Sequence, residues 1–224
     1  MSSLKPSSRA RLTRFTAADF AGQTLFDALG RTVSEAECLP RKELFEAWEV
    51  ARRVRRRLKG GSVLELGAGH GLLSWILLLL DPSATHAVCV DRRRPASAER
   101  LEAALGARWP RLAGRVRWVE GRLEEARVEP GAQVFAVHAC GPLTDRVLDL
   151  ALDARAPLAV VPCCASQDRC DAGGLLGWGV DLGLAVDATR VQRLRAAGYA
   201  VHTALIPPEI TPQNRLIVAT PPAK

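Results

Sequence analysis

Three glycines at alternate positions form the most informative local pattern in the chain. Gly67, Gly69 and Gly71 lie between a predicted strand over 62–66 and a predicted helix over 70–80. Since glycine has no Cβ atom, the backbone there can turn tightly and a ligand can approach it closely. The pattern therefore favours a loop that binds a nucleotide-like cofactor. A strand-to-helix turn without any ligand would also accept one or two glycines.

Two carboxylates near this loop narrow the choice of cofactor. Asp91 closes the next predicted strand, about 20 residues after the loop, where a carboxylate can accept hydrogen bonds from both ribose hydroxyls. The dinucleotide fingerprint reads G-x-G-x-x-G, whereas this loop reads G-x-G-x-G with Glu65 two residues before the first glycine. Glu65 would also repel a pyrophosphate, so both the glycine spacing and this charge argue against a dinucleotide.

The form E-x-G-x-G-x-G resembles motif I of the class I S-adenosylmethionine-dependent methyltransferases, and the resemblance spans roughly residues 61–222. The positive sulfonium of that cofactor is compatible with a nearby carboxylate. The resemblance implies that the glycines border the methionine and ribose portions, that Asp91 binds the ribose and that Glu65 supports the loop. Arg122 is a departure, because many members have an acid there that faces the adenine. The implied cofactor contacts are Glu65, Gly67, Ala68, Gly69, Gly71, Asp91, Arg92, Gly121, Arg122, Leu123 and His138.

Two further motifs follow the fourth and fifth predicted strands. His-Ala-Cys-Gly occupies 138–141 and Pro-Cys-Cys occupies 162–164. Together they resemble a branch that contains the methyltransferase-domain-32 proteins and the tRNA 2′-O-methyltransferases of the acceptor stem. In those relatives a histidine or an aromatic residue follows the paired cysteines, whereas Ala165 stands there in this chain.

These motifs supply the candidate catalytic residues, which are His138, Cys140 and Asp145. Methyl transfer is an in-line displacement, so alignment supplies much of the acceleration, and a base is needed only if the acceptor carries a proton. His138 is the first candidate for that base, with His202 and Asp145 as alternatives. His138 could equally be a buried imidazole satisfied by backbone groups, and residues 144–145 could simply form a helix N-cap.

The six cysteines are too sparse for a disulfide scaffold and are expected to be free thiols. A zinc site would need four thiolates, and the spacing C-C-x₅-C together with a distant Cys140 lacks the usual C-x₂₋₄-C knuckle. No metal is therefore predicted. Cys163 and Cys164 are expected to line the substrate side of the site.

The charge distribution is uneven. The formal net charge is +7, and residues 1–59 contain 13 basic against 7 acidic residues. A helix is expected over 41–59, with Arg52, Arg56 and Lys59 as a ridge that binds a polyanionic substrate such as RNA. Because 27 of the 31 basic residues are arginine, GC-rich coding could also explain the excess.

The strand and helix pattern predicts an α/β fold. Strands are expected over 62–66, 85–90, 115–119, 133–137, 158–161, 199–206 and 215–220. Helices are expected over 70–80, 96–108, 144–153 and 188–197. This alternation indicates a doubly wound, mostly parallel sheet, and the resemblance implies seven strands with the last one antiparallel. Residues 1–20 are expected to be a flexible tail, 21–60 a basic helical extension and 61–224 the methyltransferase domain. The long segment over 167–187 is expected to be either a lid or substrate-selecting loop or a family-specific insertion.

The sequence thus predicts a cytoplasmic methyltransferase that uses S-adenosylmethionine and acts on RNA, with tRNA as the first choice. The longest apolar run, 72–80, is too short to span a membrane. A small-molecule or protein methyltransferase, or a non-catalytic module that binds S-adenosylmethionine or RNA, are the alternatives. The sequence leaves the oligomeric state open.

Overall fold

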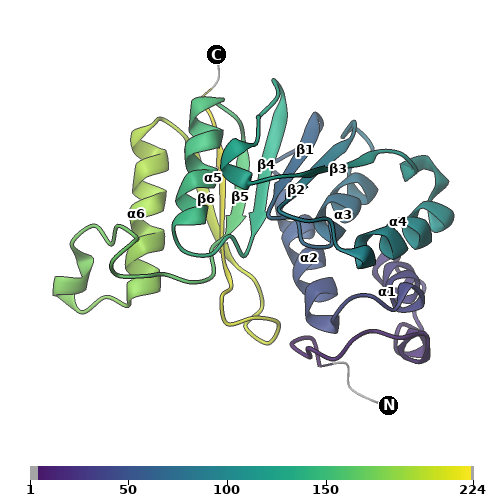
Figure 1. Ribbon diagram of the computed structural model, residues 1–224. Coiled ribbons are helices and arrows are strands. Elements are labelled where there is room, and N and C mark those ends of the chain that lie inside the picture. Colours follow the sequence, from purple (N-terminus) through teal and green to yellow (C-terminus); the bar gives the residue numbers. More distant parts are fainter. Residues whose placement is uncertain (1–4, 223–224) are drawn as a thin grey trace.

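The computed structural model describes residues 5–222 and has three layers, with helices on both faces of one central sheet (Figure 1). The seven strands have the order β3-β2-β1-β4-β5-β7-β6. The first five strands of the chain run parallel, and β7 is antiparallel to both of its neighbours, β5 and β6. The strands are β1 (Ser62–Leu66), β2 (Ala87–Asp91), β3 (Val116–Glu120), β4 (Ala132–Val137), β5 (Leu158–Val161), β6 (Ala200–Leu205) and β7 (Arg215–Thr220). The predicted fold class is confirmed.

The helices divide into two groups, because each group packs its apolar side chains into a separate core. Helices α1, α2, α3 and α4 cover one face of the sheet, and α5 and α6 cover the other. The α-helices are α1 (Leu25–Ala36), α2 (Arg41–Val54), α3 (Leu72–Leu80), α4 (Ala96–Arg108), α5 (Pro142–Asp153) and α6 (Leu182–Ala196). Short 3₁₀ helices are η1 (Arg14–Asp19), η2 (Pro110–Leu112), η3 (Leu123–Glu125) and η4 (Leu175–Trp178). Because α6 begins at Leu182, the predicted loop over 167–187 is shorter than expected.

The carboxyl ends of the parallel strands meet at one edge of the sheet. The glycine loop follows β1, Asp91 ends β2, and residues 121–123 follow β3. His138 follows β4, and the paired cysteines come shortly after β5. Parallel pairing therefore gathers all the predicted cofactor and catalytic residues at this edge, which is where open α/β sheets bind ligands.

The N-terminal segment differs from the predicted tail. Leu12 and Phe20 are fully buried, and the Phe20 ring packs edge-on against Phe26 of α1. Arg11 forms an isolated antiparallel bridge with Pro40. Single apolar side chains without helical or strand periodicity anchor this segment, which is why the sequence pattern missed the packing. Residues 1–4 of the predicted tail lie outside the described residues.

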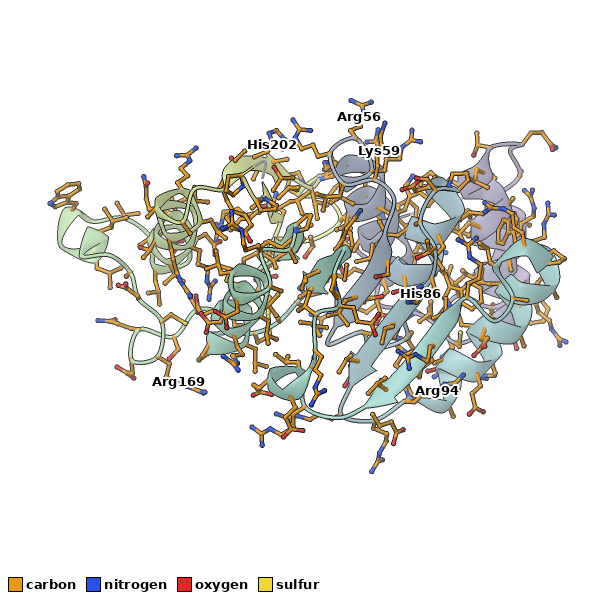
Figure 2. The ribbon with its side chains drawn as sticks, turned by 90° about the horizontal axis from the view of Figure 1, so that it is seen from above. Arg56, Lys59, His86, Arg94, Arg169 and His202 are labelled. Carbon is orange, nitrogen blue, oxygen red and sulfur yellow. A yellow bond between two sulfur atoms is a disulfide. The ribbon has the colours of Figure 1, made fainter. Side chains whose placement is uncertain are left out.

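The basic helix also ends earlier than predicted. Helix α2 stops at Val54, and the next residues form a turn in which the Arg57 guanidinium lies 3.2 Å from Nδ1 of His202. Arg56 and Lys59 therefore leave the helix and lie beside His202, before β1 begins (Figure 2). The glycine loop follows the other end of β1, so the predicted ridge is not continuous and does not face the cofactor loop.

Among residues 5–222, no helix has both the length and the apolar composition that a membrane crossing requires.

Candidate active site

The glycine loop combines a strained backbone with open space. Gly67, Gly69 and Gly71 have φ angles of 68°, 54° and 73°, in the left-handed region that favours glycine. A Cβ atom on Gly67 or Gly69 would have no heavy atom within 4 Å, so the loop leaves room for a ligand. A Cβ atom on Gly71 would lie 2.9 Å from the Trp118 ring. The first two glycines therefore form the cradle, and the third permits close packing.

Asp91 is fixed against this loop by two backbone donors. Its Oδ2 accepts a hydrogen bond from the amide of Gly69 at 2.8 Å, and its Oδ1 accepts one from the amide of Arg92 at 2.7 Å. The carboxylate remains half-buried at the end of β2 and keeps lone pairs that face outward. This arrangement suits the predicted role of Asp91 in binding ribose hydroxyls.

Residues 121–123 continue the same edge beyond β3. The amide of Gly121 donates to the carbonyl of Asp91 at 2.9 Å, which joins this segment to the end of β2. Leu123 packs partly buried against the second core, while the Arg122 side chain is 63% exposed and lies 3.4 Å from Glu124. The predicted cofactor contacts Gly121 and Leu123 therefore lie at the same edge of the sheet as Asp91, and the side chain of Arg122 is largely exposed.

Glu65 is a buried carboxyl beneath the loop. Its Oε2 accepts hydrogen bonds from the amide and the hydroxyl of Ser74 at 2.9 and 2.6 Å, and this pair ties β1 to the first turn of α3. Burial raises the pKa of Glu65 to about 7, the bonds from Ser74 oppose that rise, and the charge of Asp91 adds to it. The predicted supporting role of Glu65 agrees with these contacts.

Replacing Glu65 by glutamine is expected to change how the stability of the ligand-free protein depends on pH. Between its ordinary pKa of 4.5 and about 7, the folded protein holds a proton that the unfolded chain has released, so stability falls as pH rises. The stability of the parent should drop by about 3 kcal/mol relative to Glu65→Gln between pH 4.5 and 8. Urea unfolding over this pH series measures the difference, and a gap that stays constant with pH would contradict the prediction.

Helix α2 lines the site together with the glycine loop and the end of β4. A pocket of about 470 Å³ lies between this helix, the glycine loop and the end of β4. His138 Nε2 donates to Oε1 of Glu46 at 2.9 Å, and the same oxygen accepts from Nζ of Lys42 at 2.9 Å. Nδ1 of His70 lies 2.9 Å from Oε2 of Glu43. The two loop-edge histidines are thus each held by a glutamate from α2.

Glu46 is ionised in this arrangement. Its side chain is 5% exposed, and burial alone would raise its pKa. The hydrogen bonds and charges of His138 and Lys42 outweigh burial, so the pKa of Glu46 lies below its ordinary value. An ionised carboxylate can only accept, so Nε2 of His138 carries the proton of this hydrogen bond, and in the neutral form of the imidazole Nδ1 is the acceptor.

Sequence reasoning missed the acidic residues of α2 because it treated the helix as a polyanion anchor. Glu43, Glu46 and Val50 recur at helical spacing, and both Glu46 and Val50 are buried. A glutamate on the buried face of an amphipathic helix was the available signal, since a buried carboxylate requires partners. The partners lie far away in the sequence, at 70 and 138.

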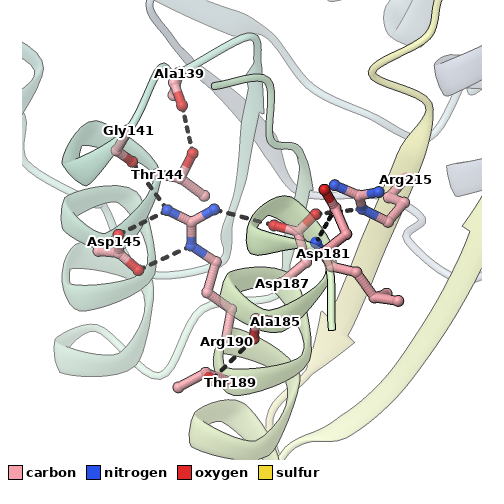
Figure 3. A network of polar contacts seen from close by, with 11 residues as sticks. Ala139, Gly141, Thr144, Asp145, Asp181, Ala185, Asp187, Thr189, Arg190 and Arg215 are labelled. Carbon is pink, nitrogen blue, oxygen red and sulfur yellow. Dashed lines mark hydrogen bonds and ion pairs between the residues drawn. The ribbon is translucent and has the colours of Figure 1, made fainter. Parts of the chain in front are cut away.

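The remaining catalytic candidates have structural partners. Cys140 and Cys163 are joined by a disulfide, which corrects the expectation that both are free thiols. Asp145 accepts two hydrogen bonds from Arg190, at 2.9 and 2.7 Å (Figure 3). This bidentate ion pair joins α5 to α6, so Asp145 has a structural role in addition to the catalytic one that the sequence predicted.

The start of α5 also differs from the prediction. Its N-cap is Gly141, and the hydroxyl of Thr144 donates to the carbonyl of Ala139 (Figure 3). Residues 144–145 therefore lie within the first turn and do not cap the helix. The reason is that Pro142, which suits a first helical turn, starts the helix two residues before the predicted boundary.

The predicted substrate contacts do not gather at one place. Arg52 forms hydrogen bonds of 3.1 Å with Glu49 on its own helix, and Arg56 and Lys59 lie before β1. Cys163 and Cys164 lie at the carboxyl edge, where the sulfurs of Cys140, Cys163 and Cys164 are within 4.8 Å of one another. Since two of these sulfurs are bonded to each other, Cys164 is the free thiol of this group.

The family of the chain follows from its sequence as well as from this geometry. The model of the methyltransferase-domain-32 family, described as a methyltransferase domain, matches residues 43–169, which is more than half of the chain. The chain belongs to this methyltransferase family. S-adenosylmethionine is therefore its cofactor, and the open cradle at Gly67 and Gly69 with the fixed carboxylate of Asp91 fits that cofactor. No curated protein sequence matches the chain significantly.

Solved structures agree with a class I methyltransferase fold. An O-methyltransferase family protein from Burkholderia thailandensis is 17% identical, with a TM-score of 0.54 over 95% of this chain and 64% of its own. The mitomycin 7-O-methyltransferase MmcR is 18% identical, with a TM-score of 0.54 over 92% and 60%. The M1A22 tRNA methyltransferase TrmK from B. subtilis is 14% identical, with a TM-score of 0.52 over 78% and 66%. The methyltransferase described here spans less than two thirds of the length of each of these proteins.

Proposed function

We propose that this protein transfers the methyl group of S-adenosylmethionine to RNA, with tRNA as the preferred class. Methyl transfer as the reaction is supported by the pocket that is lined by the glycine loop, Glu65, His138 and α2. One wall of this pocket is the cradle expected to bind the cofactor, and another holds an imidazole with a free acceptor nitrogen. A methyl acceptor with an ionisable proton fits between these two walls.

The roles of the residues follow from their contacts. Bound S-adenosylmethionine supplies an activated methyl group, so the protein has to align the acceptor and remove its proton. Asp91 and the glycine loop hold the cofactor, and the ionised Glu46 orients His138 by accepting a hydrogen bond from its Nε2–H. Nδ1 of His138 then accepts the proton of the attacking group. Lys42 keeps Glu46 ionised and belongs to the positioning set.

Replacing His138 by glutamine is expected to lower kcat by about 100-fold or more, because a positioned base contributes roughly 10²–10⁴-fold. The affinity for S-adenosylmethionine should change by less than about threefold. Glu46→Gln should give a smaller loss of kcat and shift the pH profile, since the neutral amide no longer fixes the tautomer of His138. Steady-state kinetics across pH 5–9 measure both variants. An unchanged kcat in His138→Gln would make His138 a structural residue.

RNA as the acceptor is supported by the basic character of the chain and by motif resemblance. The net charge of +7 favours a polyanion, and the His-Ala-Cys-Gly and Pro-Cys-Cys segments resemble the tRNA branch. TrmK, whose fold is similar, is described as a tRNA methyltransferase. The acceptor atom is left to experiment.

Turnover of radiolabelled S-adenosylmethionine on total RNA, on protein extract and on a small-metabolite fraction tests the proposal. Label should enter RNA, and enrichment in tRNA should follow fractionation. Label confined to protein or to small molecules would refute the RNA acceptor while keeping a methyltransferase. Calorimetry that detects the binding of S-adenosylmethionine without turnover on any fraction would indicate a binding module instead.

A further inference from the structure

A second pocket at the carboxyl edge of the sheet is lined by four arginines. It measures about 600 Å³ and lies beside the segment that links β4 to α5. Its arginines come from four different places in the chain: Arg92 follows β2, Arg122 follows β3, Arg146 lies in α5, and Arg169 follows β5. We call this group the arginine pocket. Glu124 is the one acidic residue in its lining.

The guanidinium groups of this pocket have few hydrogen-bond or ion-pair partners among residues 5–222. The side chains of Arg92 and Arg169 are exposed and form no hydrogen bond or ion pair with any residue in 5–222. Arg122 has a contact of 3.4 Å with Glu124. Arg146 lies 3.8 Å from an Asp149 oxygen and donates to the carbonyl of Glu124 at 3.4 Å. Most of the N–H donors of the four groups therefore have no partner among residues 5–222 and are available to a ligand at the pocket.

Several arginines elsewhere in the molecule hold the fold together. Arg111 donates to the carbonyls that end α3, and Arg115 donates to the carbonyl of Thr85 at 2.9 Å. Arg190 is 3% exposed and binds two aspartates. The four arginines of the pocket have no comparable structural role, so their convergence from four separate segments calls for a ligand.

The beginning of α5 adds to the positive potential of the pocket. This 12-residue helix has Gly141 as its N-cap, and Gly141, Pro142 and Leu143 all line the pocket. The amides of Gly141, Leu143 and Thr144 already donate to carbonyls and Pro142 has no amide proton, so α5 contributes only the positive end of its dipole, and this effect alone would not define a site. Here it reinforces four guanidinium groups against a single carboxylate.

We propose that the arginine pocket binds a phosphate group of the methyl acceptor. This inference rests on the proposed function, and it places the acceptor's phosphate next to the 138–141 segment. Arginine matches phosphate because its planar donors bind two oxygens at once. Arg92 and Arg122 border the cofactor side of the pocket, whereas Arg146 and Arg169 lie on the side of α5 and β5, where the acceptor belongs.

The pocket replaces the predicted basic ridge as the phosphate contact. Arg169 lies on the opposite side of the molecule from Arg56 and Lys59 (Figure 2). Those two residues precede β1, whereas the arginine pocket lies at the same strand ends as the glycine loop. A phosphate bound near Arg56 would leave the acceptor away from the cofactor, but one bound at Arg146 and Arg169 leaves it beside the cofactor.

The test compares two double variants that remove the same charge. Arg146→Gln/Arg169→Gln alters the pocket without touching the expected cofactor contacts. Arg127→Gln/Arg195→Gln removes two exposed arginines outside it. Each protein, saturated with S-adenosylhomocysteine so that the adenosine site is filled, is titrated with a labelled single-stranded RNA dodecamer, with uridine 5′-monophosphate and with uridine, across a salt series.

The pocket variant should bind the dodecamer at least tenfold more weakly than the parent at low salt, with a log–log salt slope smaller by about 1.4, or about 0.7 for each lost contact. The control variant should stay within about twofold of the parent. Uridine should not respond to the pocket variant, because it has no phosphate. A dodecamer affinity far above that of uridine monophosphate assigns the phosphate to a nucleic-acid backbone, and equal affinities assign it to a small phosphorylated acceptor.

Equal losses in the two double variants would overturn the inference, as would a pocket variant that binds every phosphate ligand like the parent. These outcomes are independent of the turnover assay. If RNA is methylated but the pocket variant binds normally, the proposed function stands and the pocket assignment is wrong. If RNA is not methylated but uridine monophosphate binding is lost in the pocket variant, the pocket stands and the RNA acceptor is wrong.

Discussion

Replacing Gly69 by valine is expected to abolish detectable binding of S-adenosylmethionine. The side chain would project into the space that the loop leaves open, because a Cβ atom at Gly69 has no protein atom within 4 Å. It would also disturb the amide that donates to Asp91 at 2.8 Å, and so would remove two cofactor contacts at once. A loss of at least about 100-fold in affinity follows, since a glycine here permits the close approach of a ligand to the backbone. Isothermal titration calorimetry measures it.

Gly114→Val is the matched control for this substitution. Gly114 is exposed, has a φ angle of 72°, and likewise has no atom within 4 Å of its Cβ position, but it precedes β3. Both variants place a branched residue in the left-handed region, which costs of order 1–3 kcal/mol of stability. If both variants lower the melting temperature by a similar amount and only Gly69→Val loses cofactor binding, the result would support the assignment of Gly69 to the cofactor cradle. Normal binding by folded Gly69→Val would remove Gly69 from the site.

Replacing Arg190 by alanine is expected to destabilise the protein by about 3–5 kcal/mol, the usual effect of leaving one side of a buried ion pair without its partner. The Arg190 guanidinium is 3% exposed and binds Asp145, Asp187 and the carbonyl of Gly141 (Figure 3). Its loss would leave Asp145 and the nearly buried Asp187 with fewer donors and free the start of α5. Urea unfolding followed by circular dichroism measures the change.

Arg193→Ala deletes the same side chain one turn later on α6. Arg193 is 41% exposed and pairs with Asp149 at the surface, so its removal should cost less than about 1 kcal/mol. Two variants of equal stability would mean that the Arg190 network contributes no more than a surface ion pair. Because Asp187 also binds Arg215 of β7 at 2.6 Å, the same network connects α5, α6 and the terminal strand.

Local patterns were sufficient for much of the fold. The apolar runs of β1, β5 and β7 predicted their bounds, because strands buried on both faces read as continuous apolar segments between turn residues. The bounds of α4, 96–108, also agree with the prediction. Helix starts were less predictable at α3, α5 and α6. At those places, glycine or aspartate caps set the boundary, and the apolar periodicity alone did not mark it.

The N-terminal region shows where local patterns fail. Helix α1 packs against α4, which begins at Ala96 far along the chain, and Leu12 and Phe20 are buried in the same core. The basic sequence from 52 to 59 suggested one continuous helix, yet α2 ends at Val54 and Arg57 then meets His202 of β6. This contact cannot be deduced from neighbouring residues, because its two partners lie 145 residues apart.

The sequence by itself determined the fold class and the cofactor, and it predicted which residues form the cofactor cradle. These predictions depend on short-range features, since β1, the glycine turn and the start of α3 lie within about a dozen residues. Parallel pairing then brings the carboxyl ends of the strands together. Only the tertiary structure decided the state of the catalytic candidates. Glu46 holds His138, Arg190 holds Asp145, and Cys163 is bonded to Cys140. Each partner is more than 20 residues away, and a buried charge or thiol is defined by what the fold places against it.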